Sequence, residues 1–237
     1  MKVIILAGGK GKRLEPYTTV LPKPLLPVGD FPILEVVIKQ LKAFGFSDII
    51  LAVGHLGNLI QSYFGNGREF GVKISYHFEQ KPLGTVGALA SIKNLKRTFL
   101  VLNGDILTTF DFSEFLARHK KNKNIATIAV TKREMKVDFG VCECDDFDTL
   151  KRYTEKPTLR YLVSMGIYLF EPEILKFIHK GKKLDFPQLM NILLKRGEKI
   201  SVFRSADFWL DLGRPEDYIR GMEQFERIKN KIFNPKK

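Results

Sequence analysis

Two patterns of hydrophobic residues alternate along the chain. Short apolar or alternating runs predict strands, and apolar residues that recur every three or four positions predict amphipathic helices. Strands are predicted at 3–6, 49–53, 72–78, 99–102, 125–130, after Gly140, at 163–168 and at 199–203. Helices are predicted at 34–44, 59–64, from near Thr85, at 112–120, 172–178 and 185–194, and from Pro215. This alternation favours an α/β fold with a mainly parallel sheet, and neither an internal repeat nor a linker divides the chain.

A glycine-rich, basic loop follows the first predicted strand. Residues 6–27 read LAGGKGKRLEPYTTVLPKPLLP, with four cations and a single acid, Glu15. The loop leaves the carboxyl edge of the sheet, where open α/β proteins bind their ligands. Its glycines at 8, 9 and 11 permit close backbone approach, and their N–H groups can point at an anion. Four prolines stiffen the remainder. The pattern predicts a phosphate-binding loop.

Two commoner phosphate-binding motifs are not matched. Leu14 stands where a dinucleotide fingerprint needs its third glycine, and no stretch reads GxxxxGK[ST]. An ordinary turn with incidental lysines is the alternative. Arg13 and the Pro22-Lys23-Pro24 segment argue against that alternative.

Two aspartates and a small-residue turn also have more than one interpretation. Asp105 follows a buried strand and Gly104, a position suited to Mg²⁺ beside phosphates or to a helix N-cap. Asp211 precedes Gly213 and could serve only the loop structure. The turn at 82–89 leads to a helix with Thr85 as N-cap, and its small residues suit either tight packing or a flat ligand.

Composition and charge narrow the class of protein. With 237 residues, 44% hydrophobic and 27% charged, the chain suits one globular domain. No apolar run approaches the roughly 20 residues that span a bilayer, and no signal-peptide pattern opens the chain. Cys142 and Cys144 cannot easily bridge within a strand, so we expect reduced thiols and a cytoplasmic protein. The net charge of +13 suits anionic small substrates or nucleic acid.

Several motifs, spread in order over nearly the whole chain, resemble those of the sugar-phosphate nucleotidyltransferases, also called nucleotide-sugar pyrophosphorylases. GGKGKRL with PKPLLPV in the loop and WLDLGRPEDY at 209–218 are specific, whereas GD at 104–105 and EKP at 155–157 are weak. PLGTVG at 82–87 and VSMGIY at 163–168 add to the likeness. In the last of these, Ser164 replaces the family's asparagine and offers the sugar a hydroxyl instead of an amide.

The resemblance implies a fold and a domain plan. The fold is a Rossmann-like three-layer α/β/α arrangement with a mixed, mostly parallel sheet, of the nucleotide-diphospho-sugar transferase type. A single domain would cover 1–237, with a nucleotide-binding part at about 1–110, a sugar-phosphate-binding part at about 111–220, and a C-terminal helix and basic tail. From the 26 residues after Asp211 we expect one helix and a basic tail, without the additional domains that some relatives carry.

The resemblance also implies the role of each site residue. The nucleotide would contact Leu6, Ala7, Gly8, Gly9, Gly11, Arg13, Gln80, Gly84 and Thr85. Catalysis would use Arg13, Lys23 and Asp105, and Mg²⁺ would be held by Asp105 and Asp211. The sugar phosphate would contact Asp105, Gly140, Glu155, Lys156 and Ser164.

The implied reaction joins an NTP to a sugar 1-phosphate and releases pyrophosphate. The likeness to the mannose-1-phosphate guanylyltransferase-like branch favours GTP and mannose 1-phosphate or a related sugar. A thymidylyl-, uridylyl- or cytidylyltransferase acting on glucose 1-phosphate or an amino-sugar 1-phosphate is the alternative, because Gln80, Gly84 and Gly87 can meet any base edge.

Two rivals belong to other classes of protein. A non-catalytic nucleotide-sugar-binding relative would be expected to lose Arg13, Lys23 or the aspartates, and this chain keeps them. A nucleic-acid binder is suggested only by the charge, because the chain lacks interleaved aromatic and basic residues. We therefore expect no nucleic-acid or membrane partner, and we leave self-association open.

Overall fold

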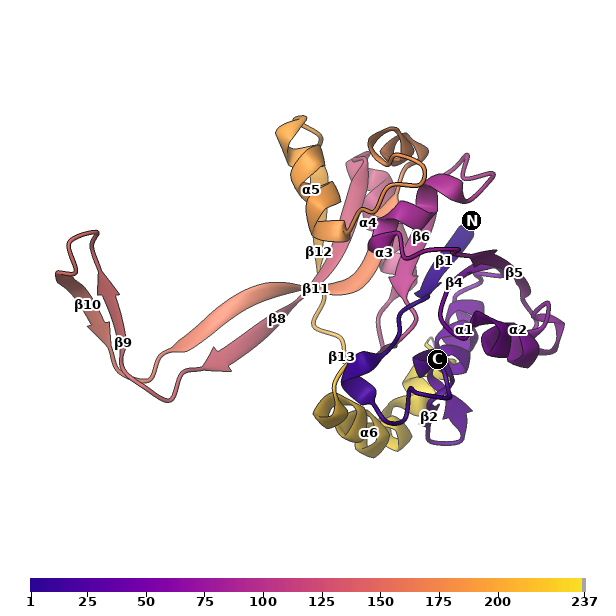
Figure 1. Cartoon of the computed structure of the whole chain (residues 1–237), viewed down its shortest axis with the longest axis horizontal. Coiled ribbons are helices and arrows are strands. Elements are labelled where there is room, and N and C mark those ends of the chain that lie inside the picture. Colours follow the sequence, from indigo (N-terminus) through magenta and orange to yellow (C-terminus); the bar gives the residue numbers. More distant parts are fainter. Residues whose placement is uncertain (236–237) are drawn as a thin grey trace.

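A seven-stranded sheet forms the centre of the computed structural model, which describes residues 1–235 (Figure 1). The strand order is β12-β8-β11-β6-β1-β4-β5. β11 runs antiparallel to both of its neighbours, and the other pairs of neighbouring strands are parallel. The strands are β1 (Lys2–Ala7), β4 (Asp48–Val53), β5 (Lys73–Phe78), β6 (Phe99–Asn103), β8 (Ala126–Lys136), β11 (Thr158–Phe170) and β12 (Ile200–Arg204). The expected mixed, mostly parallel sheet is confirmed.

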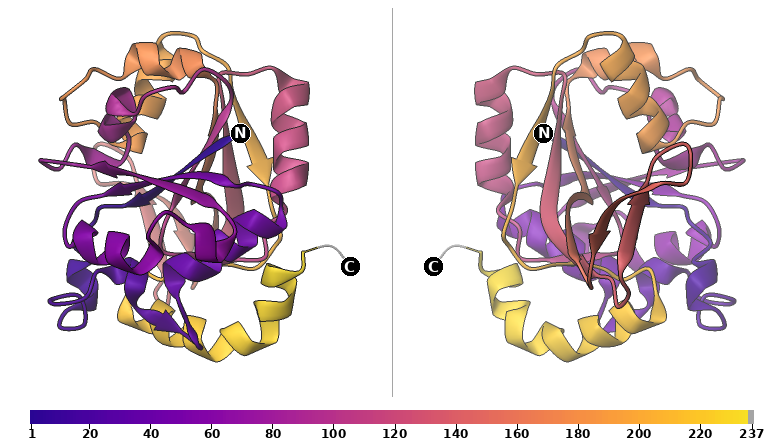
Figure 2. Two further views of the ribbon diagram at one scale, coloured as in Figure 1. Left: turned by 90° about the vertical axis from the view of Figure 1, so that its right-hand side faces the viewer. Right: turned by 90° about the vertical axis from the view of Figure 1, so that its left-hand side faces the viewer.

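Helices cover both faces of this sheet. Successive side chains of β1 point to opposite faces, so Val3 and Ile5 join one core and Ile4 joins the other. The first core includes side chains of α1 (Ile33–Ala43), α2 (Gly57–Phe64) and α4 (Phe112–Asn122), and the second includes those of α3 (Gly84–Gly87) and α5 (Phe186–Lys195). Figure 2 shows α4 and α5 on opposite sides of the sheet. The predicted three-layer α/β/α architecture is confirmed.

A third core lies under the last helix, α6 (Pro215–Phe233). Phe225 of this helix packs with residues of the loop and of two short ribbons. The ribbons pair β2 (Pro27–Val28) with β3 (Phe31–Pro32), and β7 (Ile106–Thr108) with β13 (Trp209–Asp211). The 3₁₀ turns are η1 (Lys12–Leu14), η2 (Lys23–Leu25), η3 (Arg68–Phe70), η4 (Ala88–Ser91) and η5 (Pro172–Phe177). Residues 236 and 237 of the predicted basic tail lie outside the described residues.

β8 and β11 continue beyond the sheet as a two-stranded arm. Side chains of β8 are buried up to Val130 and are mostly exposed from Lys132 onward. The arm ends in a hairpin of β9 (Val141–Cys144) and β10 (Leu150–Thr154). Figure 1 shows this hairpin at the far end of the arm, well away from the rest of the molecule. We call residues 131–164 the arm.

Two predicted helical details differ in the structure. Thr85 does not cap the helix of its own turn, because Leu83 is the N-cap of the single turn α3. Instead, the N–H of Thr85 donates to the carboxylate of Asp185, 2.9 Å away. The helix predicted at 172–178 is the 3₁₀ segment η5. Among residues 1–235, none of the helices has the length and apolar character needed to cross a bilayer.

Candidate active site

The carboxyl ends of three parallel strands meet at one edge of the sheet. Leu6 at the end of β1 pairs with Asn103 at the end of β6, and Ala7 pairs with Val53 of β4. The N–H of Gly104 donates to the Leu6 carbonyl at 2.9 Å, and a side chain at Gly104 would lie 3.0 Å from the same oxygen. Glycine suits this close contact, because any side chain would push against the Leu6 carbonyl, and the contact places Asp105 beside the start of the loop.

The glycine-rich loop is held open toward this edge. Gly11 has a φ of +67°, in the left-handed region that favours glycine, and its carbonyl accepts from the Thr18 hydroxyl at 2.9 Å. None of the hydrogen bonds found within residues 1–235 uses the N–H of Gly8, Gly9 or Gly11. These donors are therefore available to an anion, as expected for a phosphate-binding loop.

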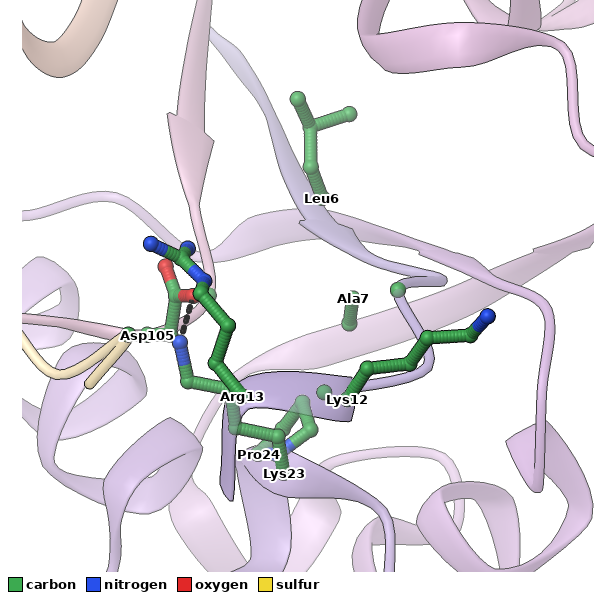
Figure 3. Close-up of a pocket in the computed structure, with 11 residues that line it drawn as sticks. Leu6, Ala7, Lys12, Arg13, Lys23, Pro24 and Asp105 are labelled. Atoms are coloured by element: carbon green, nitrogen blue, oxygen red, sulfur yellow. Dashed lines mark hydrogen bonds and ion pairs between the residues drawn. The ribbon is translucent and has the colours of Figure 1, made fainter. Parts of the chain in front are cut away.

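Two connected cavities lie along the loop. The first, which we call the loop cavity, has a volume of about 240 Å³ (Figure 3). The second, which we call the edge cavity, has a volume of about 570 Å³ and lies toward β4 and α3. Leu6, Gly9 and Asp105 line both cavities. A ligand that spans the two would thus pass directly over Asp105.

Asp105 and Asp211 are brought together by the β7–β13 ribbon. Asp211 pairs with Ile106, and the N–H of Leu212 donates to the Asp105 carbonyl at 3.0 Å. Lys23 lies between the carboxylates: its ammonium pairs with Asp105 and lies 3.9 Å from Oδ1 of Asp211. Figure 3 shows the side chains of Arg13, Lys23 and Asp105 gathered at one end of the loop cavity.

The carboxylate of Asp211 is incompletely paired. Its Oδ1 is buried and has no hydrogen-bond partner within residues 1–235. Burial, and then the negative charge of Asp105, raise the pKa of Asp211, while Lys23 and Arg13 act in the opposite direction. A divalent cation bound to the two aspartates would favour the ionised form of Asp211 and so oppose this shift.

The residues present fit the predicted magnesium ion. Mg²⁺ prefers carboxylate oxygens and usually keeps several water ligands, so two aspartates beside a phosphate site form a suitable donor set. The unpartnered oxygen of Asp211 is the observation that supports this assignment. Within the described residues no group of three or more His, Cys, Asp and Glu side chains forms a metal-binding cluster. A metal here would depend on these two carboxylates and on its substrate.

The predicted nucleotide-binding residues all line these cavities. Leu6, Ala7, Gly9, Gly11, Arg13, Lys23 and Asp105 line the loop cavity, and Gly8, Gln80, Gly84 and Thr85 line the edge cavity. The sequence analysis missed Gly54, His55 and Asn103, which also line the edge cavity. Each follows or ends a buried strand, so the rule that singled out Asp105 applies to these positions too.

The predicted sugar-phosphate residues are divided between two places. Asp105 lies in the cavities, and the Ser164 hydroxyl lies 2.9 Å from that of Tyr168 at the base of the arm. Gly140 and Glu155 lie on the arm, together with Lys156, which has a φ of +44°. The structure does not bring these three arm residues to Asp105 within this chain (Figure 1).

The arm residues nevertheless form a group of their own. The Tyr153 ring packs over Gly140, so a side chain added at Gly140 would displace it, and the Tyr153 hydroxyl donates to Glu155 at 2.9 Å. Lys156 follows directly and turns the chain into β11. The arm therefore brings Gly140, Tyr153 and Glu155 into contact, and Lys156 is the next residue along the chain.

Comparison with known proteins establishes the family. The profile of the nucleotidyl transferase family matches residues 2–228. The chain belongs to this family. The predicted relationship is thereby confirmed. Most residues that line the two cavities lie in the part of the chain, about 1–110, that was predicted to bind the nucleotide.

Relatives with different substrates match the chain at similar levels. A UTP–glucose-1-phosphate uridylyltransferase of Synechocystis is 36% identical over 97% of this chain and 65% of its own length. A mannose-1-phosphate guanylyltransferase of Mycobacterium tuberculosis is 32% identical over 94% of this chain and 64% of its own length. The chain thus spans about two thirds of the length of these curated relatives. Their names differ in both base and sugar.

Solved structures support the fold. A Bacillus anthracis protein assigned as a glucose-1-phosphate thymidylyltransferase superposes with a TM-score of 0.76 at 29% identity, over 94% of each chain. HddC from Yersinia pseudotuberculosis superposes with a TM-score of 0.72 at 26% identity, over 94% of this chain and 99% of its own.

Proposed function

We propose that this protein transfers a nucleotidyl group from an NTP to a sugar 1-phosphate, forming an NDP-sugar and pyrophosphate. One observation carries the proposal: Lys23 and the unpartnered Oδ1 of Asp211 lie beside Asp105, the aspartate that lines both the loop cavity and the edge cavity. This is where an α-phosphate would lie if the base occupied the edge cavity and the other phosphates followed the glycine loop.

The chemistry of the loop cavity suits direct transfer. Nucleotidyl transfer needs charge neutralisation and in-line placement more than a covalent nucleophile. Among the described residues, those lining the loop cavity include three cations, Lys12, Arg13 and Lys23, and no Ser, Cys or His. The sugar phosphate itself would then attack the α-phosphate, with pyrophosphate as the leaving group.

Each basic group has a distinct task in this proposal. The N–H groups of the glycine loop and the Arg13 guanidinium bind the β- and γ-phosphates and stabilise the departing pyrophosphate. Lys23, fixed by Asp105, stabilises the negative charge that grows on the α-phosphate in the transition state. Asp105 and Asp211 would hold Mg²⁺, which when bound supplies positive charge against the α-phosphate.

GTP and mannose 1-phosphate, or a related sugar, are the proposed substrates. Relatives named mannose-1-phosphate guanylyltransferases, at 32–34% identity, recur in a mycobacterium, a fish and a plant. The uridylyltransferase at 36% identity supports the alternative, UTP with glucose 1-phosphate. Gln80 in the edge cavity provides both a donor and an acceptor, so it can serve a purine or a pyrimidine.

Product identification tests the proposal and its substrates together. The protein would be incubated with Mg²⁺, equimolar ATP, GTP, UTP, CTP and dTTP, and one sugar 1-phosphate at a time, and the products identified by mass spectrometry. We expect GDP-mannose as the main product. A UDP- or dTDP-sugar would reassign the base, and no NDP-sugar from any combination would contradict the proposed reaction.

A further inference from the structure

The arm holds half of the proposed sugar-phosphate site out of reach of the other half. Ser164 lies near the base of the arm, and Lys156 lies two residues before β11 begins, so the extended stretch from Thr158 to Ser164 alone separates them by about 20 Å. A lysine side chain spans only a fraction of that length. Figure 1 shows the β9–β10 hairpin directed away from the sheet edge that carries Asp105. In a single chain the site is incomplete.

The arm surface is unusually apolar for a part that extends into solvent. Seven large hydrophobic side chains of the arm are exposed, among them Phe139 at 77% and Phe147 at 89%. Exposed apolar groups gathered on one projecting element mark an interaction surface. The whole chain carries +13, but the arm contains seven cations and seven acids and is neutral.

The charge near the arm tip complements that of the cavities. Residues 138–155 contain two cations and six acids, a formal charge of −4. The two cavities are lined by five cations, including Lys10 and Lys81, and by two acids, Glu79 and Asp105. Opposite charges favour and orient the approach of two surfaces. The acidic tip is therefore complementary in charge to the cavity edge of another copy of this chain.

We propose that two copies exchange arms, so that Gly140, Glu155 and Lys156 of one copy complete the sugar-phosphate site over Asp105 of the other. The exchange is isologous, because each copy gives its arm and receives its partner's, as in a closed two-fold dimer. It buries the exposed aromatic residues at the tip. This inference rests on the proposed function, because it assigns the arm residues to the sugar phosphate.

Heterodimers of two defective chains test the exchange. A Lys23→Ala chain and a Lys156→Ala chain, with different tags, would be co-expressed and the heterodimer isolated by two affinity steps. If arms are exchanged, one of its two sites combines an intact cavity with an intact arm. We expect about half the pyrophosphate release of the wild-type dimer, against near background for each variant homodimer.

The reciprocal heterodimer is the matched control. A wild-type chain paired with a Lys23→Ala/Lys156→Ala chain has no complete site if arms are exchanged, so near-background release is expected. If each arm instead folds back over its own cavity, this heterodimer keeps one complete site and the heterodimer of the two single variants has none. Activity in the former and not in the latter would overturn the proposal. A parallel set with Asp105→Asn in place of Lys23→Ala keeps the side-chain volume and guards against misfolding.

Sedimentation separates the exchange from the proposed reaction. We expect a wild-type dimer, and a monomer for Phe139→Ser/Phe147→Ser, since both side chains are exposed and the change should leave the fold intact. Leu194→Ser/Ile219→Ser, which alters exposed apolar residues outside the arm, should remain dimeric. A monomeric wild type, or a dimer unaffected by the arm change, overturns the exchange. A dimer that depends on the arm but makes no NDP-sugar would contradict only the proposed function.

Discussion

Lys23 is unusual because it is a buried charged residue, with 7% of its surface exposed. Lysine is rarely buried unless it is paired, and Asp105 provides the partner. A buried ion pair is weak evidence for stability, because the loss of hydration offsets much of the attraction. The position of Lys23 in the loop cavity, paired with Asp105, therefore points to a role in function.

Replacing Lys23 with alanine should slow catalysis more than it weakens binding. The loss of one preorganised donor to the transition state costs about 3–4 kcal/mol, so we expect kcat to fall by roughly 10²–10³-fold. Steady-state kinetics would measure the change. Lys120→Ala, at an exposed position of α4, is the matched control. A kcat within about twofold of wild type would show that Lys23 has no such role.

Asp211→Asn should make the protein more stable and less active. The carboxylate is penalised by burial and by Asp105, and a neutral amide avoids both effects. Because 41% of the side chain is exposed, the gain should stay below about 1 kcal/mol, or roughly 2–4 °C in Tm. Pyrophosphate release should fall sharply, since one metal ligand is lost.

The gain in stability from Asp211→Asn should be larger at neutral pH than in acid. The pKa of Asp211 is about 3.8 in the unfolded chain and is raised in the folded state. At a pH between the unfolded and the folded pKa, the folded protein therefore holds more protons than the unfolded chain. Wild-type stability therefore falls as pH rises through this window. The Tm of the Asp211→Asn variant should exceed that of the wild type above pH 3.8, and the two Tm values should converge below it.

An aspartate on the arm provides the opposite case. Hydrogen bonding from Lys151, and then from Thr149, lowers the pKa of Asp145, so Asp145→Asn should bring no stabilisation at neutral pH. Thermal denaturation of the two variants across pH would compare them directly. A gain that is equal for both variants, or independent of pH, would contradict our account of Asp211.

At the scale of elements, two glycines of the loop are expected to have different roles: one maintains the shape of the loop, and the other leaves room for the ligand. Gly11 has a positive φ, and a side chain there would lie 2.8 Å from Thr18, so Gly11→Ala should destabilise the protein by about 1–2 kcal/mol. Gly9 has open space around it, so Gly9→Ala should leave stability unchanged while its methyl group enters the cavities. Calorimetric titration with GTP should show weaker binding for Gly9→Ala. Unchanged affinity would mean that the triphosphate does not follow the loop.

The sequence predicted most elements because their patterns are local. The helix at 34–44 and the strands at 49–53 and 99–102 were confirmed within a residue or two, since each has a clear apolar repeat and an end signal. The arm could not be foreseen. Residues 131–136 (TKREMK) and 158–163 (TLRYLV) have no regular apolar pattern, so the predicted strands at 125–130 and 163–168 gave no sign that the β8–β11 pairing continues beyond the sheet.

At the scale of the whole molecule, the sequence singled out candidate site residues but not how they lie relative to one another. Asp105 and Asp211 were recognised as separate motifs, and the β7–β13 ribbon that joins them pairs two three-residue strands far apart in the chain. No local pattern encodes such a contact. The place of Glu155 and Lys156 depends on where the arm goes, which the pattern does not specify.

The central claim is that this site performs magnesium-dependent nucleotidyl transfer. The most direct test is pyrophosphate release by the wild type and by Asp105→Asn, with and without Mg²⁺, using the preferred NTP and sugar 1-phosphate. We predict release that requires both Mg²⁺ and the sugar phosphate and that is lost in Asp105→Asn. Nucleotide binding without pyrophosphate release from any substrate pair would contradict the claim and indicate a non-catalytic relative.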